Sequence, residues 1–201
     1  MKRLFISALA LGMTSFAFAQ KGTVLVGGDL GFNFENNKNT EVKTSSISFN
    51  PMVGYQFTDK WTAGVIGVST FGQTEDVNGN TTVTNKNNEL GGGLFVRYTQ
   101  PLSSLFSLYV QAQGFTSVTK TETETEIGNS SITTKGNDLN KFGVNIFPAV
   151  FVNLKNNFGL NFNFGGLNMN SSKVDTDGAK AITNAGFNFG KTVNIGVTKN
   201  F

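Results

Sequence analysis

The C-terminal segment, residues 185–201, alternates large apolar side chains with small polar ones and ends in an aromatic residue. In an extended strand, neighbouring side chains point to opposite faces, so this segment has one apolar face and one polar face. A strand with lipid outside and a polar lumen inside shows this period of two. The apolar face consists of Phe187, Phe189, Val193, Ile195, Val197 and Phe201.

The same alternation recurs along the chain and predicts eight strands. The polar faces of these segments are mostly glycine, asparagine, threonine and serine, whereas the solvated face of a soluble sandwich usually carries lysine and glutamate. Each segment is long enough to cross a bilayer as a tilted strand. The predicted strands are 22–34, 46–57, 61–72, 89–100, 106–117, 139–152, 158–169 and 185–201.

The connections between these segments alternate in length. Residues 58–60, 101–105 and 153–157 are short, whereas 35–45, 73–88, 118–138 and 170–184 are long and polar. Outer-membrane barrels have short periplasmic turns and longer external loops. The pattern therefore predicts an all-β fold, an eight-stranded antiparallel up-and-down transmembrane β-barrel with both termini on the periplasmic side.

The N-terminus has the three parts of a secretory signal. Lys2 and Arg3 precede an apolar run from Leu4 to Phe16, and Ala17-Phe18-Ala19 supplies a cleavage site before Gln20. The apolar run is shorter than the ~20 residues of a spanning helix, which makes an N-terminal anchor the weaker alternative. We predict a signal peptide over residues 1–19 and one barrel domain over 20–201.

Aromatic residues gather at the two ends of the predicted strands, as expected for belts at the two membrane interfaces. Lys191 and Lys199 fall on the apolar face of the last strand. They reach headgroups at the two rims unless a β-bulge shifts the register. Tyr55, Phe57, Trp61, Tyr98, Phe106, Phe158 and Phe201 lie beside the short turns, and Phe34, Phe49, Phe71, Phe142, Phe164 and Phe187 lie toward the long loops.

Four charged residues fall on the polar faces, and we expect them inside the barrel: Asp29, Glu89, Arg97 and Lys141. Charges in a narrow lumen pair with one another because unpaired burial is costly. A structural network is favoured over a conduction gate, with Asp29 and Arg97 as the expected pair.

Three of the long loops contain two-residue hairpin signals: Asn78-Gly79, Gly128-Asn129 and Asp177-Gly178. β-prone runs flank them, so the strands are expected to continue above the membrane as hairpins. In residues 118–127 the charged Lys120, Glu122, Glu124 and Glu126 share one face, and threonines share the other. This ribbon either binds a partner, for instance by edge pairing, or is simply solvated.

The composition excludes most catalytic chemistry. The chain has no His and no Cys, so it can hold neither a Ser–His nor a Cys–His nucleophile system, and a zinc-water site is hard to build. Asp175-Thr176-Asp177-Gly178 resembles the start of a calcium loop, but the glutamate that completes such a loop is missing. We predict no catalytic residues, no cofactor and no metal.

Without Lys2 and Arg3 the net charge falls by two, from +3 to +1, and no basic stripe suggests nucleic-acid binding.

These features together resemble the small eight-stranded outer-membrane barrels, namely the OmpA transmembrane domain, OmpX and the broad "porin family" of short barrels. The final strand, Val193-Asn-Ile-Gly-Val-Thr-Lys-Asn-Phe201, is similar to that family's assembly signal, although Lys199 replaces its usual apolar residue. The resemblance implies contact with the barrel-insertion machinery through Val193, Ile195, Val197 and Phe201. It also implies outer-membrane lipid and lipopolysaccharide as surroundings.

The sequence therefore predicts a monomeric, non-enzymatic protein of a Gram-negative outer membrane. Its expected role is envelope integrity, or adhesion to an extracellular partner through the hairpins. Two alternatives remain open: a small-solute or ion channel, and a soluble periplasmic lipocalin-like binder.

Overall fold

A computed structural model describes residues 22–38, 40–128 and 130–201, except the side chains of 191–193. The predicted signal peptide, residues 1–19, lies outside these residues. Within the described ranges, no helix has the length and apolar character needed to cross a membrane.

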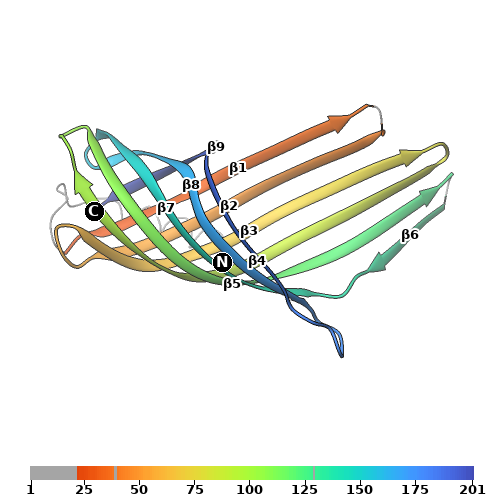
Figure 1. Cartoon of the computed structure of the whole chain (residues 1–201). Coiled ribbons are helices and arrows are strands. Elements are labelled where there is room, and N and C mark those ends of the chain that lie inside the picture. The colour runs from red at the N-terminus through yellow and green to blue at the C-terminus, as the bar shows by residue number, and fades with distance from the viewer. Residues whose placement is uncertain (1–21, 39, 129) are drawn as a thin grey trace, which may run out of the picture.

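Antiparallel strands form the whole described fold. Each wall strand pairs with the next, and β9 pairs back with β1 to close the cylinder. β6 adds only to the outer part of β5, so eight strands make the wall (Figure 1). The all-β, eight-stranded antiparallel barrel predicted from the sequence is confirmed. The strands are β1 (Val24–Asn37), β2 (Val42–Gln56), β3 (Trp61–Asn78), β4 (Thr81–Pro101), β5 (Phe106–Ile127), β6 (Ser130–Lys135), β7 (Leu139–Lys155), β8 (Phe158–Val174) and β9 (Ile182–Asn200).

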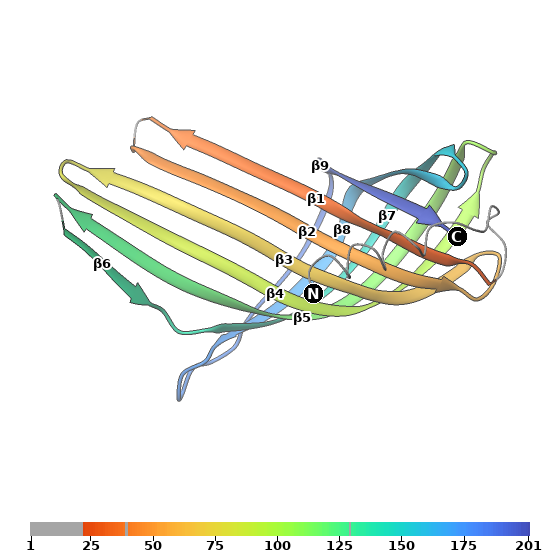
Figure 2. The same ribbon diagram turned by 180° about the vertical axis from the view of Figure 1, so that it is seen from behind.

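Several strands are longer than the sequence predicts, because the loops at one end are themselves extended hairpins. β3 and β4 stay paired from Trp61↔Tyr98 to Asn78↔Thr81, and β4 and β5 stay paired out to Thr81↔Ile127. The β-prone Thr81–Thr84 and Val118–Ile127 runs support this continuation. The expected hairpins beyond the barrel body are thus present, and Figure 2 shows them projecting far past it.

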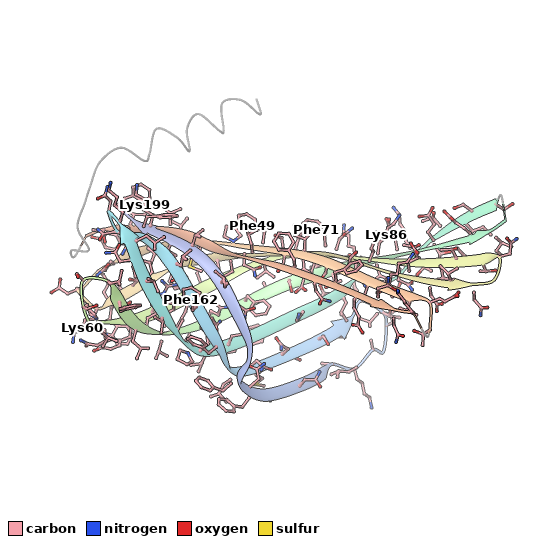
Figure 3. All side chains as sticks on the ribbon, turned by 90° about the horizontal axis from the view of Figure 1, so that it is seen from above. Phe49, Lys60, Phe71, Lys86, Phe162 and Lys199 are labelled. Carbon is pink, nitrogen blue, oxygen red and sulfur yellow. The ribbon has the colours of Figure 1, made fainter. Side chains whose placement is uncertain are left out.

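Exposure alternates along the wall as the dyad pattern requires. Leu25, Met52 and Phe95 point into the lumen and are buried, while their neighbours Val26, Val53 and Leu94 point outward. Leu94 is 69% exposed, although an aliphatic side chain of its size is normally buried in a water-soluble fold. Figure 3 shows Phe49 and Phe71 projecting from the outer side of the wall.

The predicted uniform alternation fails in β8 and β9, where the ladder shifts between Asn163 and Gly165. Asn163 is paired with Asn194, but Gly165 is paired with Phe189, so β9 contains extra residues at this point. Gly165 and Gly190 have φ values of +93° and +73°, which glycine adopts without a Cβ clash. Because of this bulge, Leu167 takes an exposed position on β8 that simple alternation assigns to the polar face.

Two groups of exposed aromatic residues lie near the two ends of the barrel body. At the end with the short turns, the rings of Trp61 and Tyr98 meet edge to face with centroids 5.0 Å apart. Lys60 and Lys199 are at this same end, and Lys86 lies toward the hairpins (Figure 3). Toward the hairpins, the exposed aromatics include Phe32, Phe34, Phe49, Phe71, Phe142 and Phe187.

The joint between β1 and β9 is the shortest in the wall. It runs only from Leu25↔Asn200 to Asp29↔Gly196. Beyond Asp29, β1 is paired with β2 alone, and the outer part of β9 is paired with β8 alone. The two strands diverge there in both views (Figures 1 and 2), and no ladder pairing joins Leu30–Phe34 of β1 to the outer half of β9.

Candidate functional site in the lumen and the outer sheet

Side chains from β2, β4 and β5 fill the middle of the lumen. Arg97 is 3% exposed and Gln111 is fully buried. The Nε and Nη2 atoms of Arg97 donate to Oε1 of Gln111 at 2.9 and 2.7 Å, and Nη2 also lies 3.3 Å from Sδ of Met52. The guanidinium stacks over the Tyr109 ring at 4.0 Å. We call this group, with Phe95, the lumen plug.

The sequence predicted Arg97 in the lumen with Asp29 as its partner, but no ion pair of the described residues joins the two. Arg97 is bonded to Gln111 instead. Gln111, Tyr109 and Met52 were missed because neutral or apolar residues on a lumen face carry no pairing signal in the sequence. The one signal that could have identified them is their position in the alternation of β2 and β5, where every second side chain faces the lumen.

The other two predicted lumen charges are brought together. Nζ of Lys141 lies 3.3 Å from Oε1 of Glu89, and the hydroxyl of Ser117 donates to the same carboxylate oxygen at 2.6 Å. Both charged side chains are partly buried. This pair lies on the outer side of the plug, where β4, β5 and β7 leave the barrel body.

Two cavities flank the plug. The outer one, of about 280 Å³, is lined by Asp29 and by asparagine and glutamine side chains. The inner one, of about 210 Å³, reaches Arg97 and Tyr109 from the side of the short turns. The two cavities share no lining residue, because the plug and the buried Ala149 and Asn161 lie between them. The described residues thus form two separate chambers.

Beyond the barrel body, β1 to β6 continue as one outer sheet, whose outward face is charged. Lys43 pairs with Glu75 and Lys86 with Glu124, each at 2.8 Å. The hydrogen bond and charge of Lys86 lower the pKa of Glu124, and Glu124 raises the pKa of Lys86 in return. Both groups are partly exposed to solvent, so these pairs orient the strands more than they stabilise them.

The inward face of the outer sheet is neutral. Thr121 and Thr123 donate to the amide oxygens of Asn87 and Asn85 at 3.1 and 2.7 Å. Thr44 and Thr74 are bonded across β2 and β3 at 3.4 Å. The division between a charged and a threonine-rich face agrees with the sequence pattern. β6 forms one edge of this sheet, and all of its residues are exposed.

The predicted hairpin tips lie at the far ends of these strands. Asn78 pairs with Thr81, so the central turn residues are Gly79 and Asn80, one position later than predicted. Gly128 has a φ of +59° between the paired Ile127 and Ser130, and Asn129 is outside the described residues. Asp177 and Gly178 occupy the centre of a turn closed by the Ala179 N–H and the Thr176 carbonyl at 3.1 Å. This turn belongs to a longer connection between Val174 and Ile182, not to a two-residue hairpin.

The predicted assembly signal occupies the outward face of β9. Ile195 and Val197 are 51% and 42% exposed, and they alternate with the buried Gly196 and Thr198. Phe201 exchanges main-chain hydrogen bonds with Val24, and its ring lies under the Lys199 ammonium at 4.6 Å. The side chain of Val193 is outside the described part of the chain.

Among the described residues, no group of three His, Cys, Asp or Glu side chains is placed to hold a metal ion. The lumen and the outer sheet therefore offer hydrogen bonding, ion pairing and cavities as their chemistry.

A scan against protein-family models and a search of curated proteins each find no match for this chain. Among solved structures, the chain is similar to the crystal structure of Ail, the attachment invasion locus protein of Yersinia pestis. The two share 16% identity over 90% of this chain and 100% of Ail, with a TM-score of 0.34. The backbone structure of the Yersinia pestis outer membrane protein Ail in a phospholipid bilayer nanodisc shares 15% identity over the same proportions, with a TM-score of 0.35. The resemblance to small eight-stranded barrels is confirmed at the level of the fold, by the strand pairing of this chain itself.

Proposed function

We propose that this protein is an integral β-barrel of a Gram-negative outer membrane, and that it acts at the cell surface through its outer sheet. In this proposal residues 1–19 direct export and are removed, and the insertion machinery reads the β9 residues Val193, Ile195, Val197 and Phe201. The mature protein is a monomer surrounded by lipid and lipopolysaccharide, and its role is envelope integrity or adhesion, without enzymatic activity.

The apolar exterior of the barrel body is the observation that carries the membrane assignment. Leu30, Val65, Leu94 and Leu108 are 43–69% exposed on the outward face of four different strands. The buried faces of these strands carry polar groups such as Asp29, Arg97 and Gln111. A water-soluble barrel has the reverse arrangement, so hydrocarbon is the solvent that suits this exterior.

The length of the strands supports a role outside the membrane. β3 has 18 residues from Trp61 to Asn78. At ~3.3 Å per residue and a tilt of ~40°, such a strand rises about 40 Å, whereas the apolar band needs only ~25 Å. The outer sheet therefore extends well past the lipid, with β6 as an exposed edge. An edge of this kind binds extended polypeptides by strand addition, so we propose an extracellular protein as the partner.

Membrane residence and surface interaction need separate tests. The refolded protein should migrate differently on a denaturing gel with and without boiling, and it should stay in the membrane pellet after urea extraction. Release by urea would instead indicate the soluble lipocalin-like alternative.

For surface interaction, residues 122–135 are replaced by a two-residue turn, which should abolish adhesion of expressing cells and preserve the heat-dependent shift. Adhesion that survives this deletion would contradict the proposed role.

The second candidate is a small-solute or ion channel, which the two lumen cavities favour. The lumen plug between them argues against steady conduction. Planar-bilayer recordings decide between the candidates, because a plugged barrel gives no sustained openings, whereas steady openings would support the channel.

A further inference from the structure

The outer lumen cavity lies where β1 and β9 part, and carboxamide side chains are the most frequent polar groups in its lining. Asn50, Gln113, Asn145, Asn163 and Asn188 all line this cavity of about 280 Å³. The volume is at the small end of the ~300–1,000 Å³ typical of ligand pockets, which suits a single ring-sized group.

The hydrogen bonds of these side chains fix which of their groups are free. Oδ1 of Asn163 accepts the Gly165 N–H at 2.8 Å, and Oδ1 of Asn188 accepts the Gly166 N–H at 3.2 Å. Oε1 of Gln113 accepts from Gln111 at 2.8 Å. Each amide oxygen is therefore used within the protein. The NH₂ groups of these three side chains have no partner among the described residues, which leaves two donors on each.

Asp29 adds a charged acceptor to this lining. It is the one charged residue among the described residues lining the cavity, and the charge of Arg97 attracts its carboxylate without a direct ion pair. Its Oδ1 lies against the Cα of Gly196, where any Cβ would clash. Because a carboxylate faces the cavity and no lysine or arginine lines it, an anionic ligand is disfavoured. A ligand for this cavity must accept several hydrogen bonds, donate at least one and carry no negative charge.

We infer that the outer cavity binds a neutral hydroxyl-rich ring, which means a sugar or the sugar headgroup of a glycolipid. Hydroxyl groups both accept and donate, as the amide NH₂ groups and Asp29 require. Phe147 also lines the cavity and offers an apolar face to such a ring. β1 and β9 are unpaired beyond Asp29, and the exposed Phe32 and Phe187 of these strands, at 77% and 69%, give a lipid tail an apolar surface.

The test uses the full mature chain, refolded in a sugar-free zwitterionic detergent, with NMR of the side-chain NH₂ groups as the readout. Three probes are titrated: methyl β-glucoside, octyl β-glucoside and octyl phosphate. The inference expects saturable shifts of the Asn163, Asn188 and Gln113 signals with a glucoside and none with octyl phosphate. If the two glucosides bind with equal affinity, the ligand of the cavity is a free sugar. Binding of octyl β-glucoside at least about tenfold tighter assigns a glycolipid headgroup with its tail against the apolar surface of β1 and β9.

The Asp29→Asn variant removes the charged acceptor with almost no change in shape, and it should weaken glucoside binding about tenfold. The matched control is Asp59→Asn, which alters a carboxylate of the inner cavity and should leave binding unchanged. If Asp29→Asn does not refold, Asn145→Leu replaces it, with the same expected loss. The inference is overturned if neither glucoside gives saturable shifts, if octyl phosphate binds as well, or if the cavity variant binds like the wild type. None of these outcomes affects the heat-dependent gel shift that tests membrane residence.

Discussion

Oε1 of Gln111 accepts two hydrogen bonds from the Arg97 guanidinium, at 2.9 Å from Nε and 2.7 Å from Nη2, in the most buried part of the barrel. The neutral amide of Gln111 thus takes the place of the carboxylate that the sequence predicted as the acceptor for Arg97. This arrangement holds the cation at mid-lumen without a direct ion pair, although the charge of Asp29 also attracts it.

Replacing Gln111 by Leu should destabilise the barrel by about 3 kcal/mol, because the buried Arg97 loses its acceptor. Urea unfolding of the protein in lipid vesicles measures the change. Gln100→Leu is the matched control, since Gln100 is exposed and bonded only to Lys60 and its own neighbour, and it should stay within about 0.5 kcal/mol of wild type. The double variant Arg97→Met/Gln111→Leu should recover part of the loss, because it removes the buried guanidinium along with its acceptor, although Asp29 then loses the attraction of Arg97. Equal stability of Gln111→Leu and wild type would contradict the role assigned to this amide.

The Lys86–Glu124 pair predicts a pH dependence confined to the outer sheet. Because Lys86 lowers the pKa of Glu124, the contribution of Glu124 is present at neutral pH and is lost as the pH falls through that lowered pKa. Because Glu124 raises the pKa of Lys86, the contribution of Lys86 is lost only when the pH rises through the raised lysine pKa. Carboxyl NMR titration should show the Glu124 pKa rising in Lys86→Met and rising less in Ser131→Ala, since Ser131 donates a weaker 3.2 Å hydrogen bond. An unchanged Glu124 pKa in Lys86→Met would rule out the pair in solution.

Gly93 and Gly114 predict opposite responses to alanine. A Cβ on Gly93 would lie 2.1 Å from the Gly114 carbonyl and 2.7 Å from Cα of Phe115, whereas a Cβ on Gly114 meets nothing closer than 3.9 Å. Gly93→Ala should therefore cost about 3 kcal/mol through forced backbone shifts, and Gly114→Ala should be tolerated. The folded fraction, read from the unboiled gel band after refolding, compares the two variants. Similar folded fractions for both variants would show that the backbone around Gly93 shifts at little cost, contrary to this prediction.

Substitutions at two exposed aliphatic residues can test whether the barrel body is surrounded by lipid or by water. Val65 is 53% exposed on the barrel body and Ile132 is 65% exposed on β6. Val65→Arg should cost about 2–4 kcal/mol in a bilayer, because Val65 lies near the middle of the apolar band. Ile132→Arg should change stability by less than about 0.5 kcal/mol, since all residues of β6 are exposed and the proposal places this strand in water. Unfolding of both variants in vesicles checks this, and equal small effects would argue against membrane residence.

The periodicity of the sequence was sufficient to predict the eight strands and the outward hairpins, but most of the residues predicted as long loops continue the strands. It failed where the backbone departs from period two. The bulge at Gly165 depends on a positive φ and on the Asn163 side chain capping the Gly165 N–H, and neither is visible in an alternation pattern.

The lumen shows the same limit. Parity along the strands placed Arg97 inside, but the choice between Asp29 and Gln111 as its partner depends on the stagger of β4 against β5, where Arg97 lies directly opposite Gln111. The Glu89–Lys141 contact likewise depends on β5 and β7 bringing Ser117 and Lys141 opposite each other. Such juxtapositions come from strand register, which one sequence does not specify for residues far apart along the chain.

The first and last strands meet over a few residues near the chain ends, from Leu25↔Asn200 to Asp29↔Gly196, while all other neighbours in the wall share longer ladders. Hydrogen bonds between two strands break cooperatively, so the shortest ladder is the weakest line in the cylinder when the wall is strained. We therefore expect heat, or a pulling force applied across the wall, to separate β1 from β9 before any other pair of neighbouring strands.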